Sequence, residues 1–106
     1  MTKKAYKTED GKLALLNTAY NECLHSDHWI AGREQNRFEK LYLHVTKTSR
    51  KIFYVVYVTF WQGEENSITV IGENKIQGWL QDNYQSLTTE EIKRFAALGF
   101  KLEETA

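Results

Sequence analysis

The sequence predicts an α+β domain in which a three-stranded antiparallel meander follows one helix and precedes two short helices (α-β-β-β-α-α). Three observations support this fold. Residues 52–61 are all β-branched or aromatic and carry no charge, which is typical of a central strand. Apolar residues before this segment recur at helical spacing, and helix-capping residues follow it.

The N-terminal helix is expected over residues 10–24. Thr8 or Asp10 can cap its start. Its apolar side is predicted from spacings of three and four between Leu13, Leu16, Tyr20, Cys23 and Leu24. Residues 25–36 are expected to form an irregular connection, with Trp29 and Ile30 holding it against the core.

The meander is expected to use residues 38–47, 52–61 and 67–71, joined by turns at 48–50 and 62–66. Both faces of the segment 52–61 are apolar, so both must be covered. Helices can cover one face. The other face, which carries Tyr42 and His44, is then covered either by the N-terminal helix or by another protein chain.

Two C-terminal helices are predicted from their ends. Asn74 is expected to cap the first, with Gln77 in the reciprocal position. Thr88 and Glu91 form a capping-box pattern for the second, and Gly99 lies where a left-handed residue ends a helix.

At 106 residues the chain predicts a single domain, with residues 1–8 and 101–106 expected as loose tails. The N-terminus has no apolar segment of the secretory kind, and no run approaches the length of a membrane span. The lone Cys23 fits a reducing compartment. A cytoplasmic protein without membrane contact is therefore expected.

The net charge is zero but unevenly distributed along the chain. Residues 33–51 carry a net charge of +4 and residues 64–106 a net charge of −4. This favours charged partners or head-to-tail self-association, unless both segments are only solvated faces.

Catalytic and metal-binding patterns are weak. Cys23, His25 and His28 lack a fourth ligand at any zinc spacing, and Cys23 lies near the C-terminal end of its predicted helix, where a thiolate is disfavoured. No phosphate loop, G-x-S-x-G or H-E-x-x-H motif occurs. We therefore expect no enzyme, no cofactor and no metal site.

Residues 41–95 resemble small open reading frames of unassigned function from bacteria, phages and other mobile elements. The shared features are a hairpin that begins with Leu41 and Tyr42, an Ile-x-x-Ile segment, Trp79 and a Thr-x-Glu-Glu helix start. The order of elements is also similar to that of some small phage inhibitors of bacterial defence systems. The resemblance implies an accessory protein that acts by binding, such as a regulator or inhibitor of a host system.

The predicted function is non-enzymatic binding to another protein or to a second copy of the chain, as in a homodimer formed through the sheet. The predicted anchors are Tyr42, Tyr57 and Trp61, with Arg50 and Lys51 at the rim. The alternative is nucleic-acid binding on an aromatic and basic sheet surface around residues 33–57. A neutral chain is a poor footprint for a phosphate binder, which ranks this alternative second.

Overall fold

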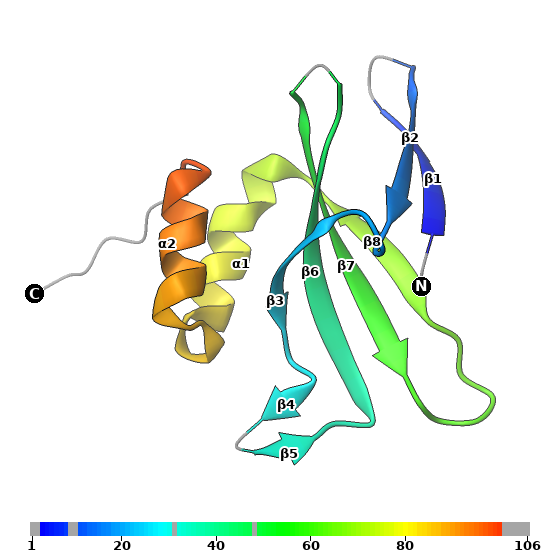
Figure 1. Ribbon diagram of the computed structural model, residues 1–106, viewed down its shortest axis with the longest axis vertical. Helices are drawn as coiled ribbons and strands as arrows, with labels where there is room; N and C mark the ends of the chain where they lie inside the picture. The colour runs from blue at the N-terminus through cyan, green and yellow to red at the C-terminus, as the bar shows by residue number, and fades with distance from the viewer. Residues whose placement is uncertain (1–2, 9–10, 31, 48, 101–106) are drawn as a thin grey trace, which may run out of the picture.

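The computed structural model describes residues 3–8, 11–30, 32–47 and 49–100. Within these residues eight strands come before two helices (Figure 1). The elements are β1 (Lys3–Lys7), β2 (Leu13–Asn17), β3 (Glu22–Ser26), β4 (Trp29–Ile30), β5 (Arg33–Glu34), β6 (Arg37–Val45), β7 (Lys51–Thr59), β8 (Ser67–Ile71), α1 (Ile76–Asn83) and α2 (Thr89–Ala97). Short 3₁₀ turns flank α1 at Glu73–Lys75 and Tyr84–Ser86.

Strand β7 is one of the two interior strands of an antiparallel sheet in the order β3-β6-β7-β8. It pairs with β6 along its whole length and with β8 from Phe53 to Tyr57. Ile52, Phe53 and Tyr54 are each no more than 6% exposed, so successive side chains are buried on opposite faces. The predicted central strand is therefore confirmed, although Phe60 and Trp61 lie beyond its end.

Helices α1 and α2 cover one face of this sheet (Figure 1). Phe53 of β7 and Leu41 of β6 point to that face and pack in one cluster with Ile76, Leu80 and Phe95 of the helices. The two C-terminal helices thus cover the apolar part of this face, which includes Phe53 and Val55 of β7.

The opposite face is covered by a hairpin of β1 and β2, and not by a helix. Ala14 and Leu16 of β2 pack against Tyr42, Ile52 and Tyr54, in a cluster that Tyr6 also joins. Leu16 is fully buried, and burying a leucine side chain contributes about 2 kcal/mol.

The predicted N-terminal helix over residues 10–24 is therefore wrong, and so is the α-β-β-β-α-α order. Leu13 and Leu16 are spaced as on a helix, but they lie on opposite faces of β2. Two asparagines support the turn that follows this strand: Asn17 Oδ1 accepts from the Ala19 backbone at 2.9 Å, and Asn21 Oδ1 accepts from the Asn17 backbone at 3.1 Å. These local bonds, together with burial of alternate residues, outweigh the helical spacing.

The second half of the predicted helix contributes a fourth strand to the sheet. Residues 22–26 form β3, which pairs with β6 at the sheet edge. The connection after it contains the β4–β5 ribbon. Residues 3–8, expected as a loose tail, hold β1 and its first turn, whereas residues 1–2 and 101–106 lie outside the described residues.

The predicted ends of α2 are confirmed. Thr88 and Glu91 form both bonds of a capping box. Gly99 has φ +98°, and the Phe100 backbone donates to the Phe95 carbonyl at 2.9 Å, as in a Schellman motif. Asn74 makes no cap, because it lies inside the 3₁₀ turn before α1. None of the described helices is long and apolar enough to cross a membrane.

Candidate interaction surfaces

The five residues predicted as a contact surface do not lie together. Tyr42 is 7% exposed and belongs to the core under the β1–β2 hairpin, and Tyr57 is half-buried. Trp61 follows the C-terminal end of β7, whereas Arg50 and Lys51 lie at its N-terminal end. The strand has nine residues, so these two groups are separated by roughly 26 Å. They therefore do not form one compact patch, and Tyr42 is covered within the chain.

Tyr42 and Tyr54 are part of a buried polar network. Their rings stack at 5.4 Å, and burial raises the pKa of both phenols. The Tyr54 hydroxyl donates to Asn21 Oδ1 at 2.6 Å, and Asn21 Nδ2 lies 2.9 Å from His44 Nδ1. Burial lowers the pKa of His44, which keeps this ring nitrogen available as an acceptor. The network joins the N-terminal segment to the sheet.

The predicted nucleic-acid surface is not assembled by this fold. Tyr42 and Tyr54 are covered, so no base can stack on them. The basic residues of segment 33–51 also separate, because β6 carries them to its two ends: Arg33, Arg37 and Lys40 at one, and Lys47, Arg50 and Lys51 at the other.

A different group of aromatic residues is exposed at the end of the molecule where both the β4–β5 ribbon and the β7–β8 loop lie (Figure 1). Trp29, Phe60 and Trp61 are 62%, 57% and 53% exposed. We call these three residues the aromatic end. Trp29 was expected to hold its connection against the core and does not, and the side chain of Ile30 lies outside the described part of the chain.

The aromatic end is supported by packed rings beneath it. His28 stacks on the buried Phe38 at 4.1 Å, and Phe60 meets both rings edge-on. The Phe60 backbone donates to the Asn36 carbonyl at 2.9 Å, which ties the β7–β8 loop to the segment before β6. Phe60 is thus held in place while much of its surface remains in solvent.

Trp61 is positioned by polar contacts. The Arg37 guanidinium lies 5.2 Å from the ring centroid of Trp61, and its Nε donates to Glu64 Oε1 at 2.8 Å. The same carboxylate oxygen accepts from the Thr59 hydroxyl at 2.7 Å, and the Thr59 oxygen in turn accepts from the Trp61 backbone at 3.1 Å. Bonding to Arg37, reinforced by Thr59, lowers the pKa of the Glu64 carboxyl.

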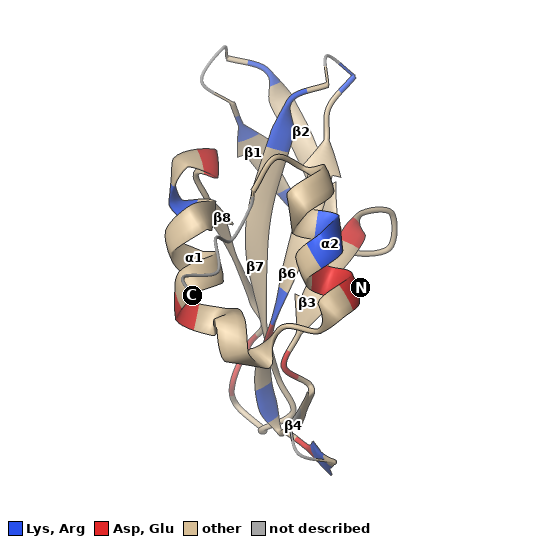
Figure 2. Cartoon of the chain, turned by 90° about the vertical axis from the view of Figure 1, so that its left-hand side faces the viewer, with Lys and Arg blue, Asp and Glu red and all other residues tan. Residues whose placement is uncertain are grey.

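The two ends of the molecule differ in charge. Residues 27–40 and 60–66, which form and surround the aromatic end, carry a net charge of −2. Figure 2 shows Lys and Arg gathered at the opposite end, around the tips of the β1–β2 and β6–β7 hairpins. The acidic residues lie mainly on the helices and toward the aromatic end. The charge difference along the long axis is thus not the one between residues 33–51 and 64–106, because the basic residues of segment 33–51 are divided between the two ends.

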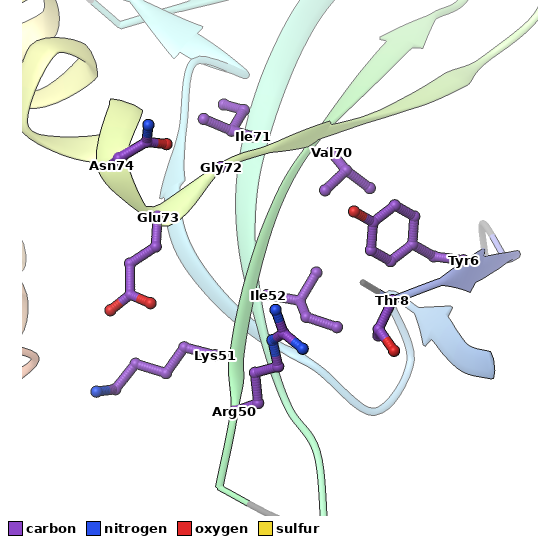
Figure 3. A pocket seen from close by; sticks show the side chains of 10 residues that line it. All are labelled: Tyr6, Thr8, Arg50, Lys51, Ile52, Val70, Ile71, Gly72, Glu73 and Asn74. Atoms are coloured by element: carbon purple, nitrogen blue, oxygen red, sulfur yellow. The ribbon is translucent and has the colours of Figure 1, made fainter. Parts of the chain in front are cut away.

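Arg50 and Lys51 line a cleft of about 290 Å³ (Figure 3). Arg50 points toward Ile52 and Thr8, whereas Lys51 runs to the other side of the strand, below Glu73. The two cations therefore face different surroundings, and neither is near the aromatic end.

Two residues considered for metal binding or nucleophilic chemistry, His25 and Cys23, lie in surroundings that do not favour either role. His25 is 5% exposed, and its two ring nitrogens lie 2.9 Å from Glu91 Oε2 and 2.8 Å from Asp27 Oδ1. Loss of solvent around Sγ raises the pKa of the Cys23 thiol, which disfavours a thiolate. Among the described residues, no three His, Cys, Asp or Glu side chains are placed to hold a metal ion.

Comparison of the chain with protein-family models, with curated proteins and with solved structures gives no match.

Sequence reasoning predicted Trp61 as an anchor and did not single out Trp29 or Phe60 as exposed. Trp29 precedes Ile30 in an otherwise polar connection, and nothing in this local pattern distinguishes an exposed ring from one that packs on the core. Phe60 was assigned to the core because it continues an apolar strand. Only the end of β7 at Thr59 places it outside.

Proposed function

We propose that the protein is a non-enzymatic module that binds another protein through its aromatic end. The observation that carries this proposal is that Trp29, Phe60 and Trp61 are largely exposed, while specific contacts hold the Trp61 backbone and the Phe60 ring in place. Tryptophan and other large aromatic residues in such settings are enriched among residues that dominate binding energy.

Preorganisation supports this role. Arg37, Thr59 and Glu64 hold the Trp61 segment before any partner arrives, and Phe38 supports Phe60. Because this segment is already ordered, binding a partner here costs less conformational entropy than binding to a loose loop would.

The charge around the aromatic end favours a protein with apolar and basic residues. A net charge of −2 repels phosphates, so nucleic acid is the weaker candidate for this surface. The resemblance of residues 41–95 suggests an accessory protein of a phage or mobile element, for which regulation of a host protein is a fitting role. The likeness to phage inhibitors depended on an order of elements that this fold does not have.

The test is selection of binders from a displayed peptide library on the immobilised protein. We expect enriched peptides to combine apolar residues with Lys or Arg. They should bind the Trp29→Ser/Trp61→Ser variant at least about tenfold more weakly than the native chain.

The matched control is Tyr20→Ser, which removes an aromatic residue that is 86% exposed in the turn after β2. This variant should bind the peptides as the native chain does. Absence of enrichment, or equal binding to the double tryptophan variant, would refute the proposal.

A further inference from the structure

A groove of about 450 Å³ lies at the opposite end of the molecule, lined by residues of the β1–β2 and β6–β7 hairpins. Three aliphatic side chains that line it are largely exposed: Leu13 at 77%, Leu15 at 58% and Val45 at 54%. Leu13 and Leu15 are on the face of β2 that points away from the buried Leu16. An apolar surface of this kind is typical of a contact site.

The groove is basic. Lys12, Lys47 and Arg50 line it, and no carboxylate does so among the described residues. Glu9 and Asp10, in the connection between β1 and β2, lie outside those residues. Counted with the cations of the two hairpin tips (Lys7, Lys12, Lys47, Arg50 and Lys51), these two acids still leave a net charge of +3.

The two ends of the folded molecule are therefore complementary. One presents exposed aromatic rings within a segment of charge −2, and the other presents exposed aliphatic side chains among cations. Opposite charge steers such surfaces together, while burial of the apolar side chains stabilises the contact.

We propose that the groove binds the aromatic end of a second copy of this chain, so that copies associate head to tail. This inference rests on the proposed function and names the partner of the aromatic end. The groove and the aromatic end lie at opposite ends of a molecule whose longest dimension is 44 Å, so they can meet only between copies. A contact between two different surfaces leaves one free surface of each kind, and association continues beyond the dimer unless a ring closes.

The test uses two variants that each remove one end. Trp29→Ser/Trp61→Ser removes the aromatic end, and Lys12→Glu/Lys47→Glu reverses charge in the groove. All four side chains are exposed, so both variants should fold as the native chain does, as checked by circular dichroism and melting temperature. Lys75→Glu/Lys93→Glu makes the same change of charge on exposed lysines near the helices and serves as the matched control.

Light scattering should show that the mass of the native chain rises with concentration past that of a dimer, and that association weakens about tenfold between low and high salt. The control should behave in the same way. Each end variant should remain monomeric alone, and an equimolar mixture of the two should form a one-to-one dimer, because one intact surface of each kind remains.

A native chain that stays monomeric at high micromolar concentration would overturn this inference and leave the peptide selection to decide the proposed function separately. Association that stops at a dimer, or a mixture of variants that does not pair, would show a contact of another symmetry. A monomeric chain that binds phosphatidylserine vesicles or single-stranded DNA through Lys12 and Lys47 would assign the groove to a different partner.

Discussion

His25 of β3 and Glu91 of α2 are 66 positions apart in the chain and are joined by a bond of 2.9 Å between Nδ1 and Oε2. The other oxygen of the same carboxylate accepts from the Thr88 backbone at 2.9 Å, closing the capping box. Glu91 therefore begins the last helix and also attaches it to the sheet. Arg94 provides a second attachment, with two bonds of 2.7 Å to Glu22 that lower the pKa of that carboxyl.

Replacing Glu91 by Ala should lower the free energy of unfolding by about 1 to 3 kcal/mol, because a cap is lost and buried His25 loses one partner. Urea unfolding followed by circular dichroism measures the change. Glu90→Ala, in the same turn but with a side chain 86% exposed, is the control and should be within about 0.5 kcal/mol of the native chain. Equal effects of the two substitutions would contradict this double role of Glu91.

Leu15 and Leu16 test the N-terminal hairpin. Leu16 is fully buried against the sheet and Leu15 is 58% exposed. Leu16→Ala should cost about 2 to 5 kcal/mol of unfolding free energy, whereas Leu15→Ala should change it little, by less than about 0.5 kcal/mol. The contrast between neighbours follows from alternation along a strand. Similar losses at both positions would argue against the strand.

His44 should make the stability of the protein depend on pH. Its pKa is lowered in the folded state, so the unfolded chain binds a proton more readily. The contribution of the neutral His44 to the free energy of unfolding is then fully present above about pH 6.5. It is lost as the pH falls through this value toward the lowered pKa.

The measurement is the unfolding free energy of the native chain and of His44→Gln at about pH 7.5 and about pH 5. The native chain should lose more stability on acidification than the variant, which has no group to titrate at this position. Other acidic and histidine groups contribute to both proteins and cancel in the difference. Parallel pH profiles would show that His44 does not make this contribution.

Two glycines should respond in opposite directions to the same substitution. Gly99→Ala should lower stability by about 1 kcal/mol, because φ +98° is strained for any residue with a side chain. Gly78→Ala, inside α1 with open space around it, should raise stability by about 0.5 to 1 kcal/mol. Thermal unfolding of both variants distinguishes them, and destabilisation by both would contradict the assigned helix.

Where signals are local, the sequence was sufficient to predict structure. The meander of β6, β7 and β8 follows from β-branched and aromatic runs separated by turns. Thr88, Glu91 and Gly99 define α2 through bonds within a few residues of chain. In both cases residues close together in the chain carry the signal: β-branched and aromatic runs for the strands, and capping residues for the helix.

The cover of the second sheet face and the composition of the aromatic end were decided by the tertiary structure. The short apolar run from Leu13 to Leu16 fits both a helix and a strand, and its packing under Tyr42 and Tyr54 selects the strand. Trp29 and Phe60 are placed at the same end of the molecule by pairing across the sheet, by the bond from Phe60 to Asn36 and by the rings of both packing on His28. Such contacts depend on how much apolar surface each arrangement buries across the whole chain, which residue spacing alone does not encode.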